Sequence, residues 1–107
     1  MFESANVAIA VYSDSEKTDT YTEDSSIAMT HMLLAASELG LGAVWLQIRL
    51  RPSNEDGISA EDFVNSRLGA PDNMKIEALL VMGHIDEQPE PQKLTEFPSE
   101  KVHVEKW

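Results

Sequence analysis

Short apolar runs alternate with longer polar stretches along this chain, and the pattern predicts three strands separated by two helices. The first apolar run extends almost without interruption from Ala5 to Tyr12 and ends at the turn-rich sequence Ser13-Asp14-Ser15. Continuous hydrophobicity, as opposed to alternation, is typical of a strand that is covered on both faces. We therefore expect residues 5–12 to form a central strand with a neighbouring strand on each side.

The first helix is predicted from Ile27 to Leu39. Asp24, Ser25 and Ser26 precede it, and any of these side chains can cap its first turn. Gly40 follows at the place where a left-handed residue commonly ends a helix. A broad apolar face is expected to pack against the sheet or a second helix; it consists of Ile27, Ala28, Met32, Leu34, Ala35 and Leu39.

Two further strands and one helix follow. The second strand is predicted from Leu41 to Ile48, and the third from Lys75 to Ile85. Between them Ser59 is the expected N-cap of a helix, with Asp62 three residues later, Ile58 and Phe63 at the positions of a hydrophobic staple, and Gly69 at the end. The order of strand, helix, strand, helix and strand predicts an α/β sandwich built on one sheet.

The C-terminal segment has a different character. Residues 86–98 are rich in proline and predict an irregular arm. Residues 102–107 alternate apolar and polar side chains, as a half-buried strand does. We therefore expect residues 86–107 to reach over a partner subunit, with Val104 and Trp107 packed on that subunit or on the sheet edge.

Composition and charge narrow the functional classes. The chain has 107 residues, of which 42% are apolar and 25% are charged, so one folded domain is expected. Its formal net charge is −11 and it has no basic stripe, which argues against nucleic acid or an acidic membrane surface as a partner. It has no cysteine, no signal-like start and no apolar run long enough to span a membrane, so a cytoplasmic location is expected.

No self-contained catalytic constellation is visible. His31, His84 and His103 lie far apart and lack the spacing of a zinc site. Gly40 and Gly42 follow a helix, whereas a dinucleotide-binding turn precedes one, so a helix cap and a close helix–strand contact explain them better. We accordingly predict no catalytic residue and no metal site within this chain.

Several segments nevertheless occur together in an informative order. They are Glu23-Asp24-Ser25-Ser26-Ile27-Ala28, Leu33-Leu34-Ala35-Ala36, Leu39-Gly40-Leu41-Gly42-Ala43-Val44-Trp45, Leu68-Gly69-Ala70-Pro71, Met82-Gly83-His84, and Glu100 to Trp107. In order and spacing they resemble the nitroreductase family over nearly the whole chain. The run from Trp45 to Arg51 resembles one branch of that family, in which a Trp-x-Gln-x-Arg pattern follows the helix.

The resemblance implies an α+β fold, a nitroreductase-like sandwich with a central sheet flanked by helices, in a homodimer that holds FMN. In such proteins NAD(P)H reduces the flavin, and the flavin reduces nitro groups, quinones or related acceptors. The resemblance also implies that a main-chain segment runs beside the isoalloxazine ring, with an N–H group near flavin N5. The residues of this segment are Trp45, Leu46, Gln47, Ile48 and Arg49.

The chain departs from the family pattern at several points. Many members have Glu-Gly where this chain has Gln47-Ile48, and only Lys93 lies near the place of the basic residue that often contacts the flavin phosphate. Members also begin with an Arg- and Ser-containing segment that grips the flavin. We therefore expect a single partial domain over residues 1–107, truncated at its N-terminus and carrying residues 86–107 as an extended arm, that is either a fragment or completed by a partner chain.

Other interpretations stay open at this point. The chain can be a non-catalytic dimerisation or small-ligand-binding module derived from the same fold, or an acidic α/β domain whose resemblance is accidental. Trp45 can equally be a core aromatic, with Arg49 and Arg51 solvated or paired with Glu55 or Asp56. Gln47 distinguishes these possibilities, because a buried amide needs a polar partner and a flavin edge would provide one.

Overall fold

The computed structural model describes residues 5, 7–88, 90, 91, 93 and 99–107. The elements follow one another in the predicted order of strand, helix, strand, helix and strand, with one turn of 3₁₀ helix after them. They are β1 (Val7–Asp14), α1 (Tyr21–Glu38), β2 (Gly42–Gln47), α2 (Ala60–Leu68), β3 (Met74–Gly83) and η1 (Ser99–Lys101).

The three strands form one antiparallel sheet in the order β1-β3-β2. The central position therefore belongs to β3, and the prediction that residues 5–12 form the central strand is wrong for this sheet. Val7 and Ile9 of β1 are 52% and 37% exposed, whereas Ala78 and Leu80 of β3 are fully buried. β3 is buried because it pairs on both edges and is covered on both faces, while β1 pairs on one edge.

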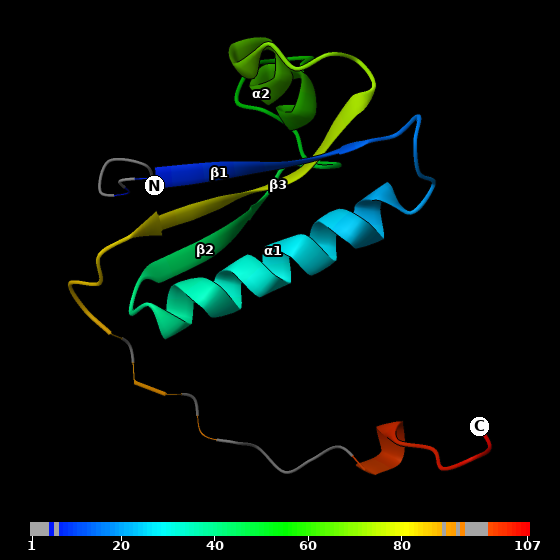
Figure 1. Cartoon of the computed structure of the whole chain (residues 1–107), viewed down its shortest axis with the longest axis vertical. Helices are drawn as coiled ribbons and strands as arrows, with labels where there is room; N and C mark the ends of the chain where they lie inside the picture. Colours follow the sequence, from blue (N-terminus) through cyan, green and yellow to red (C-terminus); the bar gives the residue numbers. More distant parts are fainter. Residues whose placement is uncertain (1–4, 6, 89, 92, 94–98) are drawn as a thin grey trace.

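Each face of the sheet is covered by one helix (Figure 1). Met29 of α1 packs against Val11 and Leu80 on one face. Ala60, at the start of α2, packs with Ile48 and Ile76 on the other. The sequence therefore folds into a sheet with a separate apolar cluster on each side, which matches the predicted sandwich.

The first helix begins earlier than predicted, at Tyr21, after Thr20. Asp24, Ser25 and Ser26 therefore lie inside the helix, and none of the three caps it. Both serines find partners: the Ser25 hydroxyl is buried and shares a hydrogen bond of 2.7 Å with the hydroxyl of Ser13, and the Ser26 hydroxyl donates to the Thr22 carbonyl. The polar start of α1 is stable because its side chains are satisfied locally or against β1.

The buried side of α1 also differs from the predicted face. Met29 and Ala36 are buried, and Met32 and Leu33 pack beside them, so only Met32 of the predicted face is involved. The other members of that face are exposed, and for the three large side chains the exposed fractions are 57% at Ile27, 64% at Leu34 and 74% at Leu39. An apolar strip of α1 is thus open to solvent in the single chain.

The predicted ends of the helices are confirmed where local chemistry determines them. The Ser59 hydroxyl accepts a hydrogen bond from the Asp62 amide and donates one of 2.7 Å to the Asp62 carboxylate. Gly69 ends α2 with φ of 67°, and Gly40 follows α1 with φ of 70°; both values lie in the left-handed region that glycine tolerates best.

The tail does not form the predicted strand. After η1 the chain is irregular, and the rings of His103 and Trp107 pack on each other with centroids 4.5 Å apart. Val104 is 80% exposed and Trp107 is fully exposed. No strand among the described residues pairs with this segment, and an isolated strand has little stability of its own. Residues 89, 92 and 94–98 of the predicted arm lie outside the described residues, and its docking on a partner subunit stays a prediction.

Candidate functional site

The predicted flavin-facing segment lies at the C-terminal end of β2, on an edge of the sheet. The amide of Ile48 donates to the Glu77 carbonyl at 3.2 Å, on the side that faces β3. Amide directions alternate along a strand, so the N–H groups of Trp45 and Gln47 point the other way, toward the outer edge. The main chain at the predicted site therefore offers hydrogen-bond donors that no other strand of the described residues uses.

The Trp45 side chain is directed into the molecule. Its ring packs against the cluster beneath α1, and its indole N–H donates a hydrogen bond of 2.8 Å to the side-chain oxygen of Gln47. The interpretation of Trp45 as a core aromatic thus describes its side chain. At the outer edge of β2, main-chain groups are therefore available and the Trp45 ring is not.

Gln47 finds its polar partners within the chain. Its side-chain nitrogen donates to the Glu77 carboxylate at 3.0 Å and lies 3.3 Å from the carbonyl oxygens of Arg49 and Glu77. With Trp45 donating to its oxygen, the amide is occupied at both ends. A flavin edge is therefore not needed to satisfy this side chain.

Glu77, which sequence reasoning missed, lies at the centre of this network. It is 5% exposed, and its carboxylate accepts from Gln47 with one oxygen and from Arg49 Nε with the other, at 2.8 Å. A buried carboxylate is costly unless such partners surround it. The available signal was a single acidic residue inside an apolar strand, between Ile76 and Ala78.

The two arginines behave differently. Arg49 is paired, but with Glu77 and not with Glu55 or Asp56, the partners that the alternative interpretation named. Arg51 is exposed and forms no ion pair within the part of the chain that the structure describes. Arg49 is therefore the arginine that belongs to the site.

Two hollows border the predicted segment. One, of about 180 Å³, is lined by Arg49, Leu50, Tyr21, Glu61 and Lys75. One carboxylate oxygen of Glu61 is buried and has no hydrogen-bond partner among the described residues. The other, of about 360 Å³, lies between the sheet and α2. Three residues of the predicted segment line this second hollow, namely Leu46, Gln47 and Ile48.

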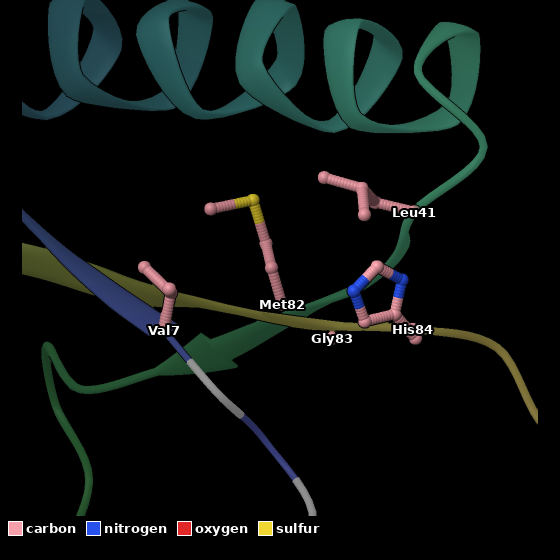
Figure 2. A pocket seen from close by; sticks show the side chains of 5 residues that line it. All are labelled: Val7, Leu41, Met82, Gly83 and His84. Carbon is pink, nitrogen blue, oxygen red and sulfur yellow. The ribbon is translucent and has the colours of Figure 1, made fainter.

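A smaller hollow of about 130 Å³ lies at the opposite end of the sheet (Figure 2). It is lined by Val7 at the start of β1, Leu41 before β2, Met82 and Gly83 at the end of β3, and His84 directly after that strand. Figure 2 shows the His84 ring beside Leu41, below the last turns of α1. These walls are apolar apart from the imidazole, so this hollow offers little to hold a polar cofactor.

Neither a cluster of possible metal ligands nor a helix that could span a membrane occurs in the part of the chain that the structure describes. No three His, Asp or Glu side chains gather closely enough there to hold a metal ion. No helix there has both the length and the hydropathy that crossing a membrane requires.

The comparisons with known proteins point in one direction. A family model described as "Nitroreductase family" matches residues 1–84. A solved FMN-dependent nitroreductase from Clostridium difficile R20291 superposes with a TM-score of 0.87 at 34% identity, over 96% of this chain and 59% of that one. A candidate NADH dehydrogenase/NAD(P)H nitroreductase from Parabacteroides distasonis gives a TM-score of 0.82 at 26% identity, over 96% of this chain and 57% of that one.

Sequence relatives agree with the solved structures. A candidate NADH dehydrogenase/NAD(P)H nitroreductase from Archaeoglobus fulgidus is 31% identical over 100% of this chain, which spans 61% of that protein. A protein with the same description from Methanothermobacter thermautotrophicus is 34% identical, and the chain spans 53% of its length. The α+β fold class is confirmed, and the chain corresponds to between half and two thirds of each relative.

Proposed function

This chain belongs to the nitroreductase family, and we propose that it carries part of the FMN site of an oxidoreductase. NAD(P)H would be the electron donor, and a nitro compound, quinone or related molecule the acceptor. The proposed FMN-facing residues are those of the β2 end: Trp45, Leu46, Gln47, Ile48 and Arg49.

One observation carries this proposal, namely the open outer edge of β2. The outward N–H groups of Trp45 and Gln47 are donors on a rigid strand, and the terminal nitrogens of Arg49 add further donors beside them. The polar edge of an isoalloxazine ring is rich in acceptors, so this donor set fits it. The C. difficile neighbour, described as FMN-dependent, adds support from outside the chain.

The residues of this chain would bind and orient, and the redox chemistry would come from the flavin when it is bound. The outward N–H groups of Trp45 and Gln47 would hold the ring edge. Arg49 and Lys75 line the same hollow and would place positive charge beside it. Lys93 is the one basic residue expected near a phosphate, and we do not assign it a contact.

We propose a second copy of the chain as the partner. The exposed apolar strip of α1, with Ile27 and Leu34 more than half exposed, is the surface that association would cover. The cytoplasmic location stays a prediction from composition.

The alternative is a non-catalytic dimerisation or ligand-binding module. The observation that favours it is the engagement of Trp45 and Gln47 with each other and with Glu77, since these contacts stabilise the chain without any cofactor. Both proposals share the fold and differ in whether flavin binds.

FMN titration, followed by quenching of flavin fluorescence, tests the proposal. The purified chain is compared with its Gln47→Ala and Arg49→Ala variants, with Arg67→Ala on α2 as the matched loss of a cation and the C. difficile relative as the positive control. We expect the parent to bind FMN and Arg49→Ala to weaken binding roughly ten-fold, as the loss of a charged donor would. FMN binding that neither site variant weakens would show that the site is wrongly placed, and no binding beside a binding relative would favour the alternative.

A further inference from the structure

Glu77 owes its position to an irregularity in the central strand. Val11 pairs with Ala78 and Tyr12 pairs with Ile76, so Glu77 has no partner in β1 and forms a bulge in β3. On the other side its carbonyl accepts from the amides of both Ile48 and Arg49, at 3.2 and 3.1 Å. A bulge bends a strand and redirects a side chain, and here the carboxylate reaches the end of β2.

The side chains of Glu77 and Trp45 together bind both ends of the Gln47 amide. The amide nitrogen of Gln47 donates to Glu77, and the amide oxygen accepts from the Trp45 indole. The orientation of the amide is fixed as a result, because the reversed amide would set donor against donor at Trp45 and acceptor against acceptor at Glu77. Gln47 is therefore a rigid link between the core and the β2 end, and its side chain has little left to offer a ligand.

Arg49 is held in a different way. Only its Nε is bound by Glu77, at 2.8 Å, and its side chain is 36% exposed against 6% for that of Glu77. Its two terminal nitrogens form no hydrogen bond within the part of the chain that the structure describes, and the residue lines the hollow that Tyr21, Glu61 and Lys75 also line. The ion pair thus fixes the inner half of the guanidinium and leaves the outer half free.

We infer that Glu77 is a positioning residue for the cofactor site: from the bulge in β3 it holds Gln47 and Arg49, so that the outward N–H of Gln47 and the outer guanidinium of Arg49 face a flavin. This inference rests on the proposed FMN site and deepens it. Arg49, and not Gln47, then becomes the side chain that contacts the bound group. A positioning role of this kind resembles the outer-shell hydrogen bonds that orient ligands in metal sites.

The first measurement needs no flavin. Exchange of the Trp45 indole N–H and of the Arg49 Nε–H is followed by NMR, with the exposed Trp107 indole as an internal reference. Glu77→Gln keeps the shape of the side chain but has only one accepting oxygen, so we expect both protons to exchange roughly ten-fold faster or more. Ser25→Ala removes a buried hydrogen bond elsewhere, between the hydroxyls of Ser25 and Ser13, and should leave both exchange rates unchanged.

The second measurement is FMN affinity in a double-mutant cycle. Glu77→Gln should weaken FMN binding roughly ten-fold in the parent and much less in the Arg49→Ala background, because its effect passes through Arg49. A general loss of stability would instead weaken binding equally in both backgrounds, and Ser25→Ala would then do the same. If Glu77→Gln does not fold, Glu77→Asp keeps the charge, cannot reach both partners, and is expected to give a smaller change of the same sign.

The outcomes separate the two proposals. Unchanged exchange of Trp45 and Arg49 in a folded Glu77 variant overturns the positioning role, whatever the flavin does. Equal weakening of FMN binding in both backgrounds overturns it as well. No FMN binding by the parent, beside binding by the C. difficile relative, overturns the flavin site, and the exchange rates then decide whether Glu77 holds the β2 end.

Discussion

The hydroxyl of Tyr12 donates a hydrogen bond of 2.9 Å to the side-chain oxygen of Asn65, and this bond joins β1 to α2. The two residues are 53 positions apart in the sequence. α2 has only nine residues, and among its side chains Ala60 and Val64 make the apolar contact with the sheet. The Tyr12–Asn65 hydrogen bond therefore helps to fix α2 on the sheet, since the apolar contacts of this helix come from small side chains.

Replacing Tyr12 by Phe removes this bond and keeps the ring. We expect the free energy of unfolding to fall by about 1 kcal/mol, the usual net contribution of one such hydrogen bond. Urea unfolding measures the change. Tyr21→Phe is the matched control, because no hydrogen bond of the Tyr21 hydroxyl is found among the described residues. If Tyr12→Phe and Tyr21→Phe are both as stable as the parent, the Tyr12–Asn65 bond contributes nothing to stability.

Tyr12 also leads us to expect that the folded chain loses stability at alkaline pH. Burial, and to a lesser degree the negative charge of Glu61, raise the pKa of the Tyr12 hydroxyl above its ordinary value of 10.0. The folded chain thus keeps this proton at a pH where the unfolded chain has lost it. The corresponding stability is present below pH 10.0 and is lost as the pH rises through the folded pKa.

We therefore expect the urea midpoint of the parent to fall more steeply than that of Tyr12→Phe between about pH 9 and about pH 11. Glu61→Gln should reduce the slope of the parent, because it removes one of the two causes. Parallel pH profiles for the parent and Tyr12→Phe would show that the Tyr12 hydroxyl has the same pKa in the folded and the unfolded chain.

The parts of the fold that sequence predicted well are those set by neighbours along the chain. Ser59 and Asp62 specify the start of α2 within one turn, and Gly69 specifies its end through a backbone angle that glycine adopts easily. The end of α1 at Gly40 is specified in the same way. Such signals act over a few residues and can be read directly from the sequence.

The parts that could not be predicted depend on distant partners. Glu77 is buried because Gln47 and Arg49, far away in sequence, meet it at a bulge that no local pattern indicates. Ser25 lies inside α1 because Ser13 shares its hydrogen bond. The position of the predicted FMN-facing segment was read from a family resemblance, and its contact with flavin stays a prediction.

The N-cap of α2 gives a direct test of a local signal. Ser59→Ala removes both hydrogen bonds to Asp62 and should cost about 1 kcal/mol of stability. Ser66→Ala, in the last turns of the same helix, removes a hydroxyl that only donates to the Phe63 carbonyl, and should change stability by a few tenths of a kcal/mol at most. Equal effects in urea unfolding would mean that α2 does not depend on its cap.

The exposed strip of α1 predicts self-association. Ile27 and Leu34 are two turns apart and lie on the same side of the helix, where they expose 57% and 64% of their surface. Apolar side chains exposed on one helix face are normally covered by a partner. We expect the chain to sediment as a dimer at micromolar concentration, and Leu34→Glu to raise the dimer dissociation constant roughly ten-fold or more, because a carboxylate would then be buried at the contact.

Ser66→Glu separates this effect from that of net charge. It adds the same charge at an exposed polar position of α2, away from the strip, and should leave the dimer largely intact. Circular dichroism of both variants shows whether α1 is retained. A parent that sediments as a monomer, or a folded Leu34→Glu that dimerises as the parent does, would mean that this strip is not the surface through which two copies meet.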